Sequence, residues 1–129
     1  MEMIAAMAPA VEVHVTTNGT QWSDRIERIL RRLRVHVVVS LDGVNAATYE
    51  AIRIGSQLDD VLDNVQRFAD HCRRSSTTFS LSHCLMTQNC SEFREFLELA
   101  ERIDCSVFVN TVTEPNELSL YHLAPSELR

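Results

Sequence analysis

Lysine is absent from this 129-residue chain. All twelve basic residues are arginine, against eighteen acidic residues and a net charge of −6. That balance argues against nucleic-acid binding, which needs clustered basic charge. No apolar run reaches the roughly eighteen residues of a membrane-spanning helix, and the start of the chain has no basic segment typical of a secretory signal. We therefore expect a cytoplasmic protein that binds neither nucleic acid nor membrane.

Glycine and cysteine are also scarce, with three and four residues respectively. No glycine-rich phosphate loop follows a predicted strand, which counts against the alternative of a small doubly wound nucleotide-binding domain. The cysteines stand at positions 72, 84, 90 and 105, without CxxC or another compact metal-binding spacing. They predict reduced thiols rather than a metal centre.

Four segments have the patterning of β-strands: residues 11–17, 35–41, 78–85 and 106–112. The first alternates apolar and polar residues, and the second is a β-branched run. Amphipathic segments lie between them, the clearest extending from Leu58 to Cys72. Ser23, Asn45, Ser56 and Asn89 are the predicted helix N-caps, Ser56 together with Asp59 as a capping box.

The resulting order of strands and helices predicts a parallel sheet with right-handed crossovers. Residues 1–7 have the character of a helix end, so the series begins as if in the middle. We therefore expect an α/β fold in one fragmentary domain, residues 1–129. It is predicted to be a partial parallel (βα) barrel of four strands in the order 1-2-3-4, with the helices on one outer face.

Polar residues gather where the predicted strands end, and ligands of parallel βα folds bind beyond those ends. In the second strand Val35, Val37 and Val39 share one face. His36, Ser40 and Asp42 belong to the opposite face. The apolar face is expected against the helices and the polar face toward a wet lumen. His14, His36 and His83 are conceivable metal ligands, but their positions do not force them together, and ordinary strand histidines are the simpler interpretation.

Several blocks together resemble the barrel of radical S-adenosylmethionine enzymes, above all members that modify peptides or mature other enzymes. The blocks are TNGT at 17–20, SLDG at 40–43, TYEAIRIG at 48–55, VLDN at 61–64 and NCSEF at 89–93, followed by the tail at 115–123. Each block alone is weak, and the specificity lies in their order and spacing. The resemblance covers the chain from Val11 onward.

The resemblance implies where S-adenosylmethionine would bind. Ser40 and Asp42 would lie near its ribose and amino-acid portion. Arg53 would approach its carboxylate, a pairing that suits a guanidinium fork. Asn18 would shape the floor of the site. For Arg53, a surface ion pair at a helix end is an equally good interpretation of the residues themselves.

Two parts of that family's pattern are missing. The Cx3Cx2C loop that holds a [4Fe–4S] cluster is absent, and so is the Gly-Gly-Glu stretch that binds the cofactor's amino group. We expect both in an upstream part of a longer or split enzyme. This chain alone should be inactive and hold neither S-adenosylmethionine nor a cluster stably. Its expected partners are a peptide or protein substrate or the missing barrel half. The alternative is a non-catalytic binding module derived from the same barrel.

Overall fold

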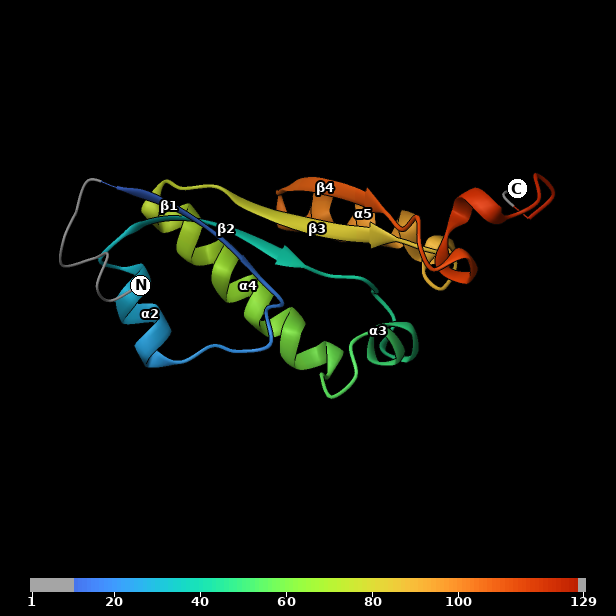
Figure 1. Ribbon diagram of the computed structural model, residues 1–129. Coiled ribbons are helices and arrows are strands. Elements are labelled where there is room, and N and C mark those ends of the chain that lie inside the picture. Colours follow the sequence, from blue (N-terminus) through green and yellow to red (C-terminus); the bar gives the residue numbers. More distant parts are fainter. Residues whose placement is uncertain (1–10, 128–129) are drawn as a thin grey trace.

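Four parallel strands form a single sheet in the order β1-β2-β3-β4 (Figure 1). In the computed structural model, which describes residues 11–127, they are β1 Glu12–Thr17, β2 Arg34–Ser40, β3 Phe79–Leu85 and β4 Ser106–Thr111. The strands, their order and their parallel direction are confirmed. The helix end expected in residues 1–7 lies outside the described residues.

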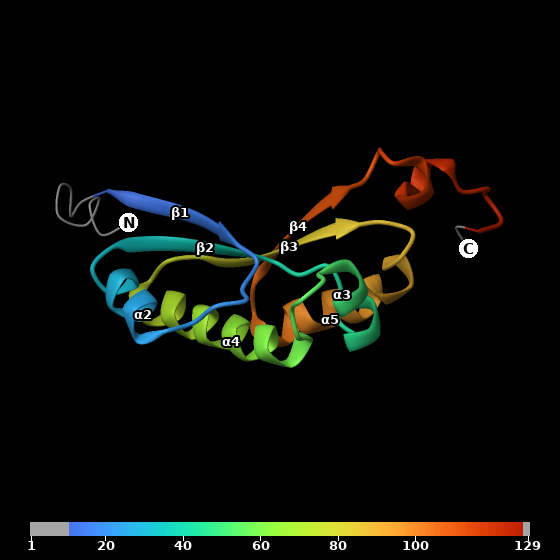
Figure 2. The ribbon, with the colours of Figure 1, turned by 60° about the horizontal axis from the view of Figure 1, so that its bottom comes forward.

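The helices connect consecutive strands. They are α2 Asp24–Leu30, α3 Ala46–Ile52, α4 Leu58–Ser75 and α5 Phe93–Ile103. Short 3-10 turns lie before α5 at Cys90–Glu92 and after β4 at Asn116–Leu118 and Leu120–His122. Figure 2 shows the four helices on the same face of the sheet. A doubly wound sheet carries helices on both faces, so the partial barrel is the architecture that fits.

The two faces of the sheet differ as the alternation in β2 predicts. Val35, Val37 and Val39 are buried beneath the helices, and α4 packs against both β2 and β3. The facing side of α4 supplies Val61, Val65, Phe68, Ala69 and Cys72 to the same core. The opposite face of the sheet has no helix over it within residues 11–127 (Figure 2). We call this side the open face.

The register fixes which side chains lie together on the open face. His14 pairs with His36, and their rings stack with centroids 4.6 Å apart. His83 belongs to the opposite face and is fully buried, with its ring 4.3 Å from that of Phe96. The three strand histidines therefore do not converge on one site.

Only one of the four predicted N-caps caps its helix through its side chain. Ser23 Oγ accepts a hydrogen bond from the Ile26 amide at 3.3 Å. Asn45 and Asn89 occupy N-cap positions, but their side chains make no capping bond. Those two predictions are wrong in mechanism: Glu92 bonds the Asn45 amide, and the Asn89 side chain bonds Asp42, Cys84 and Met86 instead of a helix end. The Ser56 prediction is wrong in position, because the N-cap of α4 is Gln57, which makes no side-chain capping bond.

No helix in the described part of the chain has the length and apolar character that crossing a bilayer requires.

The one-sided sheet predicts unequal costs for two neighbouring valines in β2. Val37 is 1% exposed beneath the helices, whereas Val38 is half-buried on the open face. Val37→Ala should lower the free energy of unfolding by about 2 kcal/mol, through lost apolar burial and a residual cavity. Val38→Ala, the control, should cost less than half as much. Equal losses in urea denaturation would contradict the one-sided sheet.

Candidate functional site

The carboxyl end of β2 is organised around the buried carboxylate of Asp42. Its Oδ1 accepts a hydrogen bond from the Cys84 amide on β3 at 2.8 Å. Its Oδ2 accepts from Arg53 Nε at 2.9 Å and also from Arg53 Nη2. Asp42 thereby links β2 to β3 and to the residue that follows α3.

Arg53 is thus in an ion pair, but one more buried than the surface pair expected at a helix end. The Asp42 side chain is 5% exposed and that of Arg53 is 35% exposed. A guanidinium has five N–H donors, and Asp42 engages two of them. Three donors remain for other acceptors, although the charge of Arg53 is already balanced by its partner.

Asn89 reinforces the same junction from the loop after β3. Its Nδ2 donates to the carbonyl oxygens of Asp42 and Cys84, both at 2.9 Å. Its Oδ1 accepts from the Met86 amide at 2.8 Å. Asn89 is fully buried, and its side chain closes the end of the β2–β3 pair instead of capping the following helix.

Glu92 caps the amino end of α3 from a distant part of the chain. Its Oε2 accepts from the amides of Val44 and Asn45 at 3.0 and 3.2 Å, and its Oε1 accepts from Thr48 Oγ1. Burial by itself raises the pKa of the Glu92 carboxyl, but these hydrogen bonds together outweigh it and hold that pKa below its ordinary value.

A hollow of about 580 Å³ opens at the carboxyl end of the sheet. Asn18 and Gln21, which follow β1, line one part of it. Tyr49, Arg53 and Ser56, around the end of α3, line another part. Tyr49 is buried, and its hydroxyl lies 3.1 Å from Ser56 Oγ. We call this cavity the rim hollow; its volume is typical of small-molecule sites.

The structure brings the four sequence-predicted residues to one end of the sheet without joining all of them. Asn18 and Arg53 line the rim hollow, and Asp42 reaches it only through Arg53. Ser40 is the last residue of β2 on the open face, paired in register with Ser82 of β3. The Asn18 side chain makes local hydrogen bonds: its Oδ1 accepts from the Thr20 amide at 3.2 Å and from Thr20 Oγ1 at 2.8 Å.

Sequence reasoning missed Tyr49, Gln21 and Ser56 as lining residues of the rim hollow. It also missed Glu92 as the cap of α3. The sequence gives no signal for Glu92, because its partners lie more than forty positions earlier. Tyr49 and Ser56 belong to the region of the family resemblance, but only the fold of α3 back over the strand ends brings them toward Asn18.

The thiols do not form a metal centre in the described part of the chain. Cys72 lies on α4 and Cys84 on β3, while Cys90 starts a 3-10 turn and Cys105 precedes β4. Burial raises the pKa of the Cys72, Cys84 and Cys105 thiols above their ordinary value, and the Asp42 carboxylate adds to this at Cys84. Residues 11–127 contain no cluster of three or more His, Cys, Asp or Glu side chains that could hold a metal ion.

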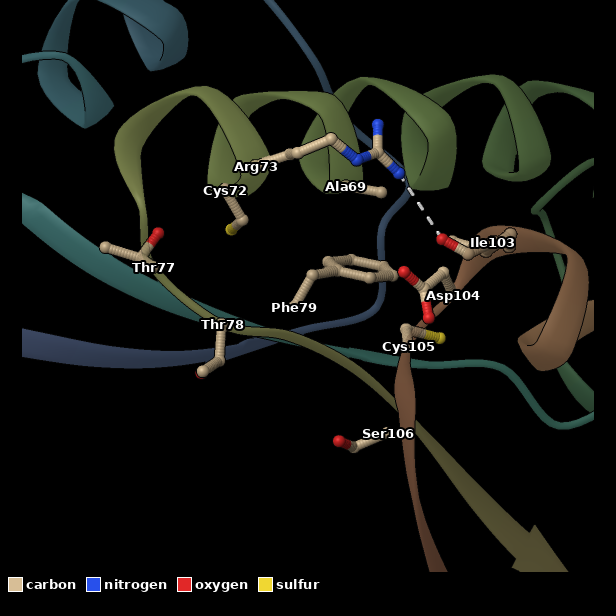
Figure 3. Close-up of a pocket in the computed structure, with 10 residues that line it drawn as sticks. All are labelled: Ala69, Cys72, Arg73, Thr77, Thr78, Phe79, Ile103, Asp104, Cys105 and Ser106. Carbon is tan, nitrogen blue, oxygen red and sulfur yellow. Dashed lines mark hydrogen bonds between the residues drawn. The ribbon is translucent and has the colours of Figure 1, made fainter.

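A second hollow, of about 450 Å³, lies at the opposite end of β3 and β4 (Figure 3). Phe79 lies between Cys72 and Cys105 in this cavity, and Arg73 spans from α4 to the carbonyl oxygen of Ile103 at 3.4 Å. It lies at the amino ends of the strands, and in βα barrels residues at that end serve stability rather than ligand binding. We assign it to packing between α4 and α5.

No protein-family model matches the sequence, and no curated protein matches it significantly.

The lowered pKa of Glu92 predicts a pH-dependent contribution to stability. A carboxyl whose pKa is lower in the folded than in the unfolded chain stabilises above the unfolded value, and this contribution disappears as the pH falls through the folded value. At pH 7, Glu92→Gln should lower the free energy of unfolding by about 1–3 kcal/mol, through weaker bonds to the start of α3.

Between pH 5 and pH 3 the difference between wild type and Glu92→Gln should shrink as the wild-type carboxyl takes up its proton, measured by urea denaturation across that range. Glu95→Gln, at an exposed position of α5 directly after Glu92, is the control and should change little. A difference that stays constant down to pH 3 would show that charge on Glu92 does not hold α3.

Proposed function

We propose that this chain is the carboxyl-terminal part of the core of a radical S-adenosylmethionine enzyme, in which it helps to bind the cofactor. The observation that carries the proposal is the rim hollow, where Asn18 and Arg53 meet at the carboxyl end of a parallel sheet. Ligands of this architecture bind at that end. Two residues chosen from the family resemblance thus line one cavity, although they lie 35 positions apart.

Arg53 supplies the groups that fit the carboxylate of S-adenosylmethionine. Three of its N–H donors are not used by Asp42, and the side chain is partly exposed in the rim hollow. Asp42 holds the guanidinium in place, so little side-chain entropy is lost when a ligand binds. In this proposal Ser40 and Asp42 support the rim hollow rather than contact S-adenosylmethionine, because neither lines the cavity.

The described residues do not fit a [4Fe–4S] cluster. Cluster ligation needs thiolates that converge, and the four cysteines stand on separate elements. Three of the four thiols have raised pKa values, which disfavours the thiolate form. We therefore assign to this chain the binding and orientation of S-adenosylmethionine, and not the electron transfer that begins the family's chemistry.

The proposal predicts that the DNA immediately upstream of the first codon encodes a Cx3Cx2C motif in one of the three forward reading frames. With the polypeptide carrying that motif, Arg53→Ala should weaken S-adenosylmethionine binding about 10- to 100-fold. The physical basis is the loss of a charge-assisted hydrogen bond of roughly 1.5–3 kcal/mol. Calorimetry on the assembled enzyme measures the change.

Arg53→Lys separates binding from stability, because it keeps a positive charge for Asp42 but loses the fork. It should retain most of the wild-type melting temperature and still lose most of the affinity. Arg67→Ala, at an exposed position of α4, is the control and should preserve both. An upstream region without the motif, or equal affinities for wild type and both Arg53 variants, would overturn the proposal.

A further inference from the structure

A hollow of about 370 Å³ lies between the segment that follows β1 and helix α4. Gln21 and Trp22 supply one wall of it, and Asp60, Asp63 and Asn64 of α4 supply the other. Its lining within the described part of the chain includes no strand residue, so the hollow does not depend on what pairs with either edge of the sheet. We call this cavity the acidic hollow; its volume lies within the range of ligand sites.

Three side chains present unused oxygen acceptors to the acidic hollow. The carboxylates of Asp60 and Asp63 are exposed and have no hydrogen-bond or ion-pair partner within residues 11–127. Asn64 is only 8% exposed, and its Nδ2 donates to the Gly19 carbonyl oxygen at 2.9 Å. Because a carbonyl oxygen can only accept, this bond fixes the orientation of the amide and leaves Asn64 Oδ1 without a donor among the same residues. A side chain more than nine-tenths buried thus offers an unpaired acceptor to the cavity that it lines.

The lining of the acidic hollow sets two carboxylates against one cation, Arg67. Asp63 and Arg67 stand four positions apart on α4, a spacing at which such side chains often pair. They form no ion pair, and the exposed Arg67 side chain has no other partner in the described chain. Asp60 lies in the first turn of α4, where negative charge suits the helix dipole, but Asp63 stands beyond that turn. The carboxylates therefore remain available to a ligand, and the field in the hollow is negative.

Trp22 gives the acidic hollow an aromatic wall. Its indole makes a T-shaped contact with Phe68 of α4, with ring centroids 4.8 Å apart and the planes at 80°. Phe68 is buried in the core, so it holds the half-buried indole in place beside the cavity. Tryptophan is the aromatic residue that attracts cations most strongly. Carboxylates, an amide oxygen and an indole together suit a cation with several N–H donors.

We propose that the acidic hollow binds the guanidinium group of an arginine side chain in a peptide or protein partner. The five N–H donors of a guanidinium can serve both carboxylates and Asn64 Oδ1, and the planar group can stack on the Trp22 indole. An anionic ligand would be repelled by the same carboxylates. A metal ion is a poorer match, because the described residues contain no cluster of three or more His, Cys, Asp or Glu side chains that could hold one.

The acidic hollow continues into two neighbouring cavities. Thr20 and Gln21 line both it and the rim hollow. Trp22 and Arg67 line both it and a further hollow of about 370 Å³ toward α2. A peptide anchored by its arginine would therefore have neighbouring residues beside the rim hollow. The assignment of that peptide as the substrate rests on the proposed cofactor site, whereas arginine binding itself does not.

Tryptophan fluorescence of the whole 129-residue chain tests the proposal, because Trp22 is the only tryptophan and lines the hollow. Titration with the peptide acetyl-Gly-Arg-Gly-amide at low salt should change the emission and reach saturation at millimolar concentration, since exposed charge pairs and a cation–π contact are individually weak. Added salt should weaken the binding by screening. The same peptide with citrulline, an uncharged isostere of arginine, is the control and should give no saturable change.

Substitutions in the lining should change the affinity in opposite directions. Asp60→Asn combined with Asp63→Asn should weaken binding of the arginine peptide about 3- to 10-fold, through the loss of two exposed charge pairs. Arg67→Gln should strengthen it about 2- to 5-fold, because it removes the cation that repels the ligand. A damaged fold cannot bind more tightly, so the gain separates binding from stability. Asp59→Asn, exposed on the same helix turn but outside the lining, is the matched control and should leave the affinity unchanged.

Identical titrations with the arginine and citrulline peptides, or no saturable change with either, would overturn the proposal. So would equal affinities of the wild type, the double aspartate variant and Arg67→Gln for the arginine peptide. Circular dichroism of every protein checks that it is folded at the temperature of the titration. S-adenosylmethionine is absent from these titrations, so their outcome is independent of the proposed cofactor site.

Discussion

The structure depends above all on the buried carboxylate of Asp42. An unpaired charge in the interior is costly, and Asp42 is stabilised by Arg53 on one oxygen and by the Cys84 amide on the other. Asn89 then binds the backbone carbonyl of Asp42 and that of Cys84. Strand ends that would otherwise separate are thereby held together, and α3 is drawn back over them. Through Arg53, this junction positions one wall of the rim hollow.

A second constraint is that the helices cover only one face of the sheet. The covered face is aliphatic and supplies the core, as the buried valines of β2 show. The open face carries the His14–His36 stack and the serines of β2 and β3. Such a surface is suited to a polar lumen and not to a second layer of helices. The proposed cofactor site lies at the carboxyl ends of the strands of this one-sided sheet.

The sequence predicts the parts of the fold that local physics controls. Alternation and β-branched runs place the four strands within a residue or two, and Ser23 caps its helix as its position indicates. The failures arise where a distant partner decides. Asn45 loses its capping role to Glu92, and the Asn89 amide serves β2 and β3, because in both cases the chain brings residues more than forty positions apart into contact. The ion pair between Asp42 and Arg53 is partly predictable. The two residues are only eleven positions apart, but it is the fold of α3 that turns Arg53 toward Asp42.

The role of Asp42 is tested most directly by a double-mutant cycle in urea denaturation, with Asp42→Asn, Arg53→Met and the two combined. If the ion pair holds the strand ends together, each single substitution should cost about 2–3 kcal/mol and leave a polar group without its partner. The double variant should then cost less than the two single losses together by at least about 1 kcal/mol. Strictly additive losses, within about 0.5 kcal/mol, would contradict the account, because Asp42 and Arg53 would then contribute independently of each other.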